Sequence, residues 1–239
     1  MIHLQGLQKS YGGFQAVKGL DLLVPAGELF CFLGPNGAGK TTTIKMITGL
    51  VRPDRGSIHI AGLDALASPV EAKRKMGYIP DTPYLYERLT VVEFMRFVGE
   101  LYHFPREKLA AAVEEQIQVF GLADKRTALL KELSHGMRQR VIYGATLLHD
   151  PAVLLVDEPF IGLDPHSIRL IKDLLRERTR RGMTVFMTTH ILAIAEEIAD
   201  RIGIIDRGTL VACGTLDEMR QRPDFGGRLE DMFLQLTMH

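Results

Sequence analysis

The sequence lacks the features that would tie it to an oxidising compartment or to a charged polymer. Its two cysteines, Cys31 and Cys213, are far apart and show no metal-ligand spacing, so we expect both to be reduced and to serve packing. Lysine and arginine total 29, and aspartate and glutamate also total 29, so no net charge attracts nucleic acid or anionic lipid. We therefore expect no nucleic-acid partner, and any attraction to phosphate has to be local.

Long apolar runs are missing as well. No stretch approaches the roughly 20 apolar residues that a helix needs to span a bilayer. The first residues, MIHLQGLQKSYGG, have neither the basic nor the apolar region of a signal peptide. We expect a cytoplasmic protein that reaches a membrane only through a partner. The 239 residues are enough for one full core, and the absence of internal repeats predicts a single copy of the site.

The hydrophobic pattern divides the chain into strand-forming and helix-forming parts. Short apolar runs punctuated by glycine and proline predict strands joined by tight turns in the first sixty residues. The expected strands are residues 2–7, 16–24, 29–33 and 57–60. From residue 82 to about residue 149 the apolar residues follow helical spacing, which predicts a helical subdomain.

The second half of the chain returns to strands. Residues 152–156 form an unbroken apolar run, as expected of a parallel strand that is buried on both faces. A helix is predicted to follow, with Asp164 as its N-cap and Pro165 at its first position. Residues 183–188 predict the next strand, and residues 202–212 predict a hairpin.

A glycine-rich loop follows the expected strand 29–33. It satisfies the pattern GxxxxGK[ST] between a strand and a helix, where glycines let successive backbone N–H groups face phosphates and the helix N-terminus adds partial positive charge. Lys40 would supply a charge to the β- and γ-phosphates, and Thr41 a hydroxyl ligand for Mg²⁺. The alternative is a turn that ends in Lys-Thr by chance. The residues expected to bind nucleotide here are Gly34, Pro35, Asn36, Gly37, Ala38, Gly39, Lys40, Thr41 and Thr42.

Acidic residues follow the buried strand 152–156. Asp157 could hold Mg²⁺ across from Thr41, and Glu158 could orient or deprotonate an attacking water. The alternative is a solvated acidic pair that ends a strand. His190 closes the next strand and points to the crevice where ligands of open α/β sheets bind, although a lone histidine is more often structural. These residues predict a Mg²⁺-dependent nucleoside triphosphatase.

The segment 133–140, Leu-Ser-His-Gly-Met-Arg-Gln-Arg, resembles the signature sequence of ABC ATPases, and we call it the signature segment. Residues 160–165, Phe-Ile-Gly-Leu-Asp-Pro, are similar to the D-loop that follows in this family. The resemblance covers essentially the whole chain, from Tyr11 to the hairpin at Arg207-Gly208.

The resemblance implies an α/β fold: a P-loop NTPase with a mostly parallel core sheet, an N-terminal antiparallel β subdomain and an inserted α-helical subdomain. Residues 1–239 would form one ABC ATPase domain. Its nucleotide-binding core would be residues 1–81 and 150–214, its helical signature subdomain 82–149, and its short helical tail 215–239.

The resemblance also implies roles for single residues. Tyr11 matches the aromatic residue that stacks on adenine, an interaction worth about 1–3 kcal/mol. Ser134 and Gly136 match residues that contact the γ-phosphate of ATP held by a second ATPase subunit. ATP and Mg²⁺ are the implied cofactors, Glu158 and His190 the catalytic residues, and a head-to-tail dimer, with a homodimer expected, the active form.

Two features depart from the family pattern. The commonest signature reads LSGGQ, whereas His135 and Met137 stand here in place of the first glycine and the glutamine. Family members usually have glutamine where this chain has Asp81, which still offers an oxygen to Mg²⁺ or its water. The link between the metal site and the helical subdomain is therefore expected to differ from the common form.

In the transporter branch of the family, the segment that matches residues 82–97 receives a short helix of an integral membrane permease. Tyr84, Leu85, Tyr86 and Leu89 are candidate contacts, with packing of the subdomain core as the alternative. The expected function is that of an ATPase subunit that powers a separate permease in export and lies peripherally at the inner face of the cell membrane. A soluble ATPase of iron–sulfur cluster assembly is the alternative. A binding module without catalysis is disfavoured because Glu158 and His190 are present.

Overall fold

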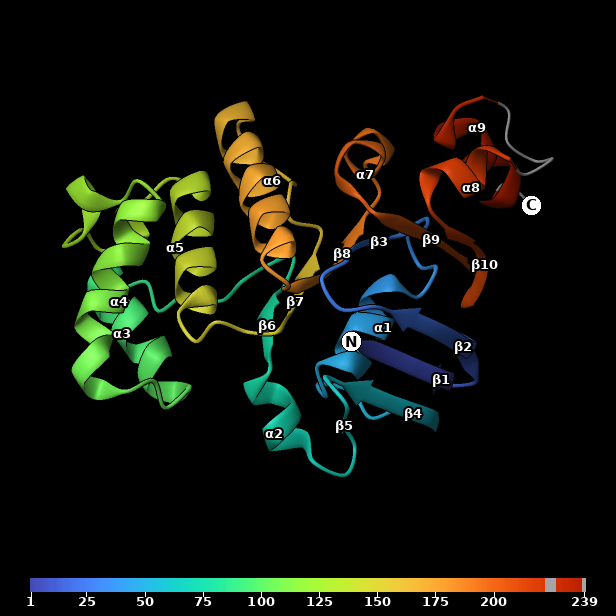
Figure 1. The fold of residues 1–239 in the computed structure, drawn as a ribbon, viewed down its shortest axis with the longest axis horizontal. Coiled ribbons are helices and arrows are strands. Elements are labelled where there is room, and N and C mark those ends of the chain that lie inside the picture. The colour runs from blue at the N-terminus through green and yellow to red at the C-terminus, as the bar shows by residue number, and fades with distance from the viewer. Residues whose placement is uncertain (222–226, 238–239) are drawn as a thin grey trace.

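The computed structural model describes residues 1–221 and 227–237. A six-stranded sheet runs through the middle of the molecule (Figure 1). Its strands, in spatial order, are β10 (Thr209–Gly214), β9 (Arg201–Asp206), β3 (Leu29–Leu33), β8 (Thr184–Thr189), β7 (Val153–Asp157) and β6 (Met76–Ile79). Neighbouring strands are parallel except β10, which pairs antiparallel with β9.

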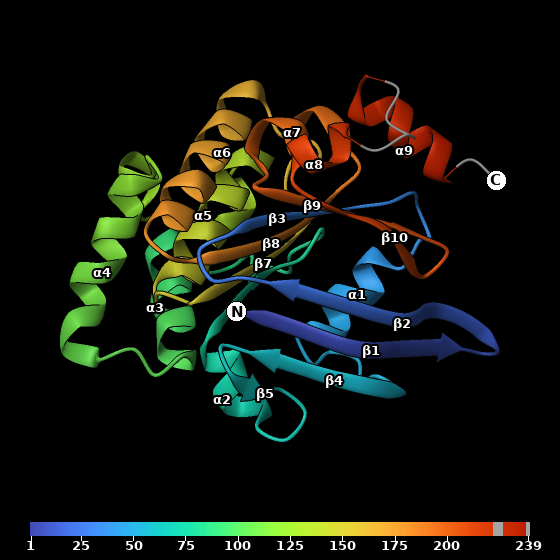
Figure 2. The same ribbon diagram turned by 45° about the vertical axis from the view of Figure 1, so that its right-hand side comes forward.

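A second, antiparallel sheet lies below the first (Figure 2). Its strands are β2 (Phe14–Val24), β1 (Ile2–Tyr11), β4 (Arg55–Ile60) and β5 (Leu63–Asp64). Helix α1 (Lys40–Ile47) lies between the two sheets (Figure 2). The expected fold, with a mostly parallel core sheet, an antiparallel N-terminal sheet and a helical subdomain, is confirmed.

Strand β3 is buried on both faces and borders two hydrophobic cores. Leu29, Cys31 and Leu33 face the core that is covered by helices. Phe30 and Phe32 face the core between the two sheets. This alternation follows from the period of two of a strand, and it fixes β3 and the loop after it in the centre of the molecule.

Helices α3 (Val91–Leu101), α4 (Arg106–Val119) and α5 (His135–Leu147) gather at one end of the molecule (Figure 1). Two of these helices begin at side-chain caps, which satisfy N–H groups of the first turn. Thr90 and Glu93 form a capping box at α3, and Ser134 caps α5. Two short 3₁₀ helices, η1 (Ala123–Lys125) and η2 (Leu130–Glu132), connect α4 to α5.

The remaining helices are α2 (Pro69–Arg74), α6 (Pro165–Arg180), α7 (Leu192–Ile198), α8 (Leu216–Arg220) and α9 (Leu229–Thr237). Asp164 caps α6 by accepting from Ser167 N at 3.0 Å, and Pro165 is its first residue, as predicted. Helices α8 and α9 lie at the opposite end of the molecule from α3 and α4 (Figure 1), and the expected tail 215–239 falls partly outside the described residues. No helix of the described residues is long and apolar enough to cross a membrane.

Most strands lie where the hydrophobic pattern predicts them. Strand β3 has the predicted bounds, and β1 continues past the predicted end to Tyr11.

The prediction that both cysteines serve packing is right for one and wrong for the other. Cys31 is buried, as expected of a packing residue. Cys213 is exposed, and its Sγ accepts a hydrogen bond from Arg201 at 3.3 Å. It lies on β10 at the edge of the sheet, where no further strand covers it in the described part of the chain.

Candidate functional site

The loop of residues 34–39 joins β3 to α1, and close contacts require its glycines. A Cβ on Gly34 or on Gly39 would lie 2.4 Å or 2.6 Å from carbonyl oxygens of neighbouring segments. Gly37 has open space around it but a φ of +81°, which side chains disfavour. Helix α1 then starts at Lys40 without a side-chain cap, so its first N–H groups are left for another acceptor, such as an anion.

Lys40 is buried against the loop that precedes it. Its Nζ donates to the carbonyl oxygens of Gly34 at 2.7 Å and Pro35 at 3.2 Å, and it lies 3.8 Å from a carboxylate oxygen of Glu158. Burial lowers the pKa of Lys40, and the negative charges of Glu158 and Asp157 partly offset this effect. The loop therefore encloses one cation that faces two carboxyl groups.

Asp157 ends β7 with its side chain buried. Its Oδ1 accepts a hydrogen bond from the Thr188 hydroxyl. Oδ2 is buried and has no hydrogen-bond partner in the described part of the chain. Burial is the main cause that raises the pKa of Asp157; the hydroxyls of Thr188 and Thr41 lower it, and the charges of Asp81 and Glu158 raise it.

This arrangement fits a divalent cation. An unpartnered buried carboxylate oxygen beside a threonine hydroxyl and further carboxylates is a set of hard oxygen ligands, which Mg²⁺ prefers. Within residues 1–221 and 227–237 no group of three or more His, Cys, Asp or Glu side chains forms a complete metal site. Mg²⁺ usually takes one or two carboxylates together with water and substrate phosphates, so a partial set is what such a site needs.

Glu158 follows Asp157 in a strained backbone conformation. Its φ of +49° is unusual for a residue with a side chain, and hydrogen bonds from its N–H to the carbonyl and hydroxyl oxygens of Thr188 hold it there. Its Oε2 lies 3.0 Å from Nδ1 of His190. The carboxyl ends of β7 and β8 thus bring Glu158 and His190 together, and strain of this kind is often found at functional sites.

Tyr11 lies at the end of β1, and its side chain is 46% exposed. Nζ of Lys9 lies 5.6 Å from the centroid of the Tyr11 ring. Asp54 holds this lysine at 2.8 Å and also accepts from the backbone N–H of Ser10 at 2.7 Å. The ring is therefore presented on an ordered strand end, with part of its surface open to a ligand.

The structure does not bring every predicted residue into one place. Ser134 is exposed and accepts a hydrogen bond from Met137 N at 3.4 Å. A Cβ on Gly136 would lie 2.7 Å from Ser167 Oγ and 2.9 Å from Asp164 Oδ2, so this glycine lets the start of α5 pack on the start of α6. Among the described residues, no hydrogen bond or ion pair joins Ser134 or Gly136 to the loop 34–41.

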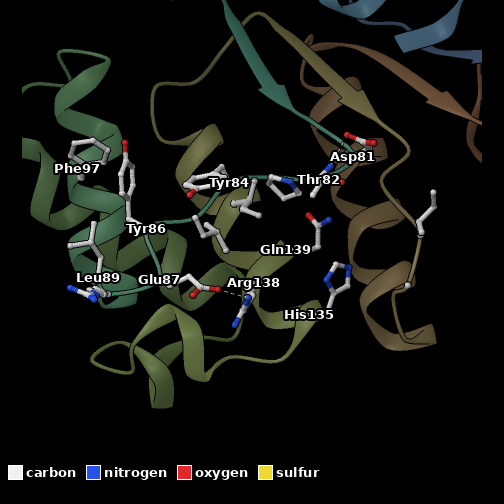
Figure 3. A pocket seen from close by; sticks show the side chains of 16 residues that line it. Asp81, Thr82, Tyr84, Tyr86, Glu87, Leu89, Phe97, His135, Arg138 and Gln139 are labelled. Carbon is white, nitrogen blue, oxygen red and sulfur yellow. Dashed lines mark hydrogen bonds and ion pairs between the residues drawn. The ribbon is translucent and has the colours of Figure 1, made fainter.

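A groove of about 1240 Å³ lies beside the signature segment (Figure 3). It includes Tyr84, Leu85, Tyr86 and Leu89, the candidate contacts from the sequence, and Tyr84 is 91% exposed. The other lining residues are Asp81, Thr82, Pro83, Glu87, Arg88, Phe97, His135, Arg138, Gln139, Ile142, Ile161 and Gly162. The groove thus adjoins Asp81 and His135, two of the three positions that depart from the common family pattern, together with the segment after Glu158.

Sequence reasoning missed Arg138 as a functional candidate. Its guanidinium bonds Glu87 of the groove and two backbone carbonyl groups that precede α5. The sequence signal was only an arginine within the signature segment. Its partners lie 5 to 51 residues away, and no local pattern names them.

Comparisons with known proteins show which sequences and structures the chain resembles. A family model described as ABC transporter matches residues 17–161. The linearmycin resistance ATP-binding protein LnrL of Bacillus subtilis (strain 168) is 37% identical over 238 residues, covering 100% of this chain and 75% of the relative. A solved ATP-binding subunit of an ABC transporter superposes with a TM-score of 0.92 at 33% identity, covering 99% of both chains. The ATP-binding cassette MJ0796, described as a dimer in a post-hydrolysis state with ADP and Pi, superposes with a TM-score of 0.82 at 25% identity, covering 90% of this chain and 99% of the other.

Proposed function

The chain belongs to the ABC transporter family of ATPases, and from that premise we propose that two copies close head to tail on ATP and so drive a separate membrane permease, in the direction of export. One observation carries the proposal. Lys40, Asp157, Glu158 and His190 meet at one edge of the sheet, whereas Ser134 and Gly136, at the start of α5, have no hydrogen bond or ion pair with them in the described part of the chain. Each copy then offers one half of a site and the complement of another.

ATP would be held mainly by the loop 34–41. Its backbone N–H groups and the N-terminus of α1 bind phosphate oxygens, and Lys40 exchanges its two carbonyl partners for the β- and γ-phosphates. Thr41 and Asp157, with Asp81 nearby, would hold Mg²⁺, which when bound neutralises phosphate charge. Tyr11 would stack on adenine, supported by its open ring and its place at the end of β1.

Hydrolysis would depend on Glu158. Its carboxylate accepts a proton from water, or orients the water, beside the γ-phosphate. With a proton on Nδ1, His190 donates to Glu158 Oε2 and fixes the direction of the carboxylate. Lys40 lies on the other oxygen, so binding of phosphate to Lys40 frees that oxygen for water.

The dimer would complete the site. Ser134, Gly136 and the N-terminus of α5 then face the γ-phosphate bound by the partner copy, where oriented N–H groups favour negative charge. The description of the MJ0796 cassette as a dimer with ADP and Pi supports this arrangement. Hydrolysis removes the phosphate that both copies hold, and the dimer opens.

The permease would bind in the groove of Figure 3. Exposed aromatic residues such as Tyr84 and Tyr86 suit an amphipathic helix, and the groove borders both the nucleotide-binding core and the signature segment. The name of LnrL, a resistance protein, favours export over import. The chain would then work at the inner face of the cell membrane while attached to the permease.

We would test the proposed ATP-dependent dimer, which we call the clamp, with Glu158→Gln and with Glu177→Gln as a surface control. Glu158→Gln should lower ATP hydrolysis about 10²- to 10⁴-fold and elute as a dimer in size exclusion when Mg-ATP is present. The wild type and Glu177→Gln should stay predominantly monomeric because they hydrolyse the nucleotide. A Glu158→Gln chain that binds ATP and remains monomeric would contradict the proposed clamp.

A further inference from the structure

Arg138 joins the groove to the backbone that leads into the signature segment. It lies in the first turn of α5, and its three kinds of nitrogen all have partners. Nε donates to the carbonyl of Leu133 at 3.2 Å, and Nη2 donates to the carbonyl of Lys131 at 2.8 Å. Nη1 donates to Oε1 of Glu87 at 3.3 Å, which Figure 3 marks with a dashed line.

The backbone makes a second connection between the same segments. Lys131 N donates to the carbonyl of Glu87 at 3.2 Å, and Leu130 N donates to the carbonyl of Leu89 at 2.9 Å. Glu87, Lys131 and Arg138 therefore form a closed ring of contacts between the groove and η2. A shift of the groove segment 86–89 is transmitted to η2 and to the guanidinium together.

The hydrogen bonds from Arg138 to the carbonyl oxygens of Leu133 and Lys131 matter more for the position of the signature segment than the ion pair does. An exposed ion pair alone contributes little to stability, and the Glu87 side chain is 59% exposed. The guanidinium is a rigid planar fork, and hydrogen bonds from a charged donor are stronger than those between neutral groups. Leu133 immediately precedes the cap residue Ser134, so these bonds set the backbone that aims Ser134 and the first N–H groups of α5.

We propose that Arg138 is a positioning residue that holds the signature segment in the geometry needed for the partner's ATP, and that its ion pair makes this hold responsive to whatever engages Glu87 in the groove. The inference rests on the proposed function of Ser134. Occupancy of the groove then reaches the signature segment through the Arg138 side chain, alongside the backbone hydrogen bonds that join residues 87–89 to η2.

The test uses the chain with four single variants and one double variant, Glu87→Gln with Arg138→Met. Arg138→Met removes the fork and keeps the length of the side chain, Arg138→Lys keeps only the charge, and Glu87→Gln removes only the ion pair. Arg126→Met is the matched control, because Arg126, which follows η1, pairs with Glu114 of α4 at 3.4 Å on the surface of the same helical subdomain, and neither residue lines the groove. All five variants are also made in the Glu158→Gln background to follow ATP-driven dimerisation.

We expect the dimer dissociation constant with Mg-ATP to rise at least about 10-fold in Arg138→Met and Arg138→Lys, and about 2- to 5-fold in Glu87→Gln. ATP affinity of the monomer should stay unchanged, because the loop 34–41 is intact. Adding Glu87→Gln to Arg138→Met should have no further effect, since the pair acts through one guanidinium. Arg126→Met should resemble the parent chain.

Dimerisation of Arg138→Met and Arg138→Lys like the parent chain, or equal losses in Arg126→Met, would overturn the inference. If Glu158→Gln itself fails to dimerise, the proposed ATP-dependent dimer is refuted. The positioning role of Arg138 is then tested by amide hydrogen exchange of the nucleotide-free chain. Exchange in residues 134–137 should then rise about 10-fold in Arg138→Lys, and unchanged exchange there would refute the positioning role. Should Arg138→Met fail to fold, Arg138→Lys and Glu87→Gln give the same answer.

Discussion

At the scale of single residues, the nucleotide site places like charges together in the ligand-free chain. Asp157 is buried with one oxygen unpartnered, and Asp81 and Glu158 add negative charge around it. Only Lys40 among the predicted site residues brings a compensating charge close to Glu158. Burying these negative charges without a cation lowers the stability of the fold, and the same oxygen atoms are suited to bind a cation.

Asp157→Asn should therefore stabilise the nucleotide-free chain while it abolishes Mg²⁺-dependent hydrolysis. The folded state raises the pKa of Asp157, so it disfavours the charged form, and the resulting cost appears as pH rises above the ordinary value near 3.8. Near neutral pH the melting temperature of the variant should rise about 2–4 °C, which corresponds to about 1 kcal/mol for a chain of this length. At pH 4 the gain should shrink. An equal or lower melting temperature of Asp157→Asn at neutral pH, measured by calorimetry, would refute this reading.

The residues with a motif around them were the ones that the sequence could predict. Lys40, Asp157 and Glu158 follow buried strands of a parallel sheet, and the carboxyl ends of such strands meet at one edge. Arg138 was missed because its role depends on tertiary proximity to Glu87, 51 residues away. Cys213 was misjudged because sequence alone does not say which strand lies at a sheet edge.

At the scale of elements, the stacked rings of His149 and Tyr102 link the helical subdomain to the core sheet. His149 follows α5, and its ring stacks on Tyr102 at the end of α3, with centroids 3.7 Å apart and planes at 10°. Its Nε2 lies 3.1 Å from the carbonyl oxygen of Met76, where β6 begins. One imidazole thus contacts two helices and a strand of the core sheet.

Because His149 is part of this contact, the free energy of unfolding should fall in mild acid. Burial lowers the pKa of His149, with the Met76 carbonyl and Asp150 partly offsetting it. The unfolded chain therefore takes up the proton more readily, so stability is complete above about pH 6.5 and falls as pH drops below that value. Between pH 7.5 and 5.5, urea unfolding should show that the wild type loses about 1 kcal/mol more than His149→Gln. The exposed His166→Gln is the control and should lose as much as the wild type.

Short elements were the hardest to predict. Strand β6 holds only four residues and contains Gly77, which weakens a strand pattern. The structure gives its reason, since a Cβ there would lie 2.7 Å from Thr146 on α5. Helix α2 has six residues and too few turns to show a period. By contrast, strands 29–33 and 152–156 were predictable because both faces are buried and the whole run is apolar.

At the scale of the whole molecule, the predicted site residues lie on two separate parts of the fold. Lys40 belongs to the nucleotide-binding core and Ser134 to the start of α5. In the proposed head-to-tail dimer, the core of one copy would meet the signature segment of the other. Defects in the two parts should then complement each other between chains.

Lys40→Ala and Ser134→Arg chains should each hydrolyse almost no ATP when assayed alone. An equimolar mixture should recover activity, up to about a quarter of the wild type, because half of randomly mixed dimers are heterodimers and each has one intact site out of two. The control is the double variant Lys40→Ala, Ser134→Arg mixed with the wild type in the same assay. Its heterodimers have no intact site, so this mixture shows only how dilution lowers the activity of wild-type dimers. A mixture of the two single variants that is no more active than either one would argue against a shared site.

The position of β3 also governs how the chain is made. Leu29 pairs with Val185, and Phe30 with Arg201, so the central strand leaves the ribosome long before either neighbour is synthesised. Until then an apolar strand with two unpaired edges stays exposed in the nascent chain, which favours aggregation. The loop 34–39 is anchored to that strand and has no fixed shape before it pairs. Competence to bind nucleotide therefore arrives late in synthesis, and chains truncated before residue 206 should depend on chaperones and fail to bind ATP.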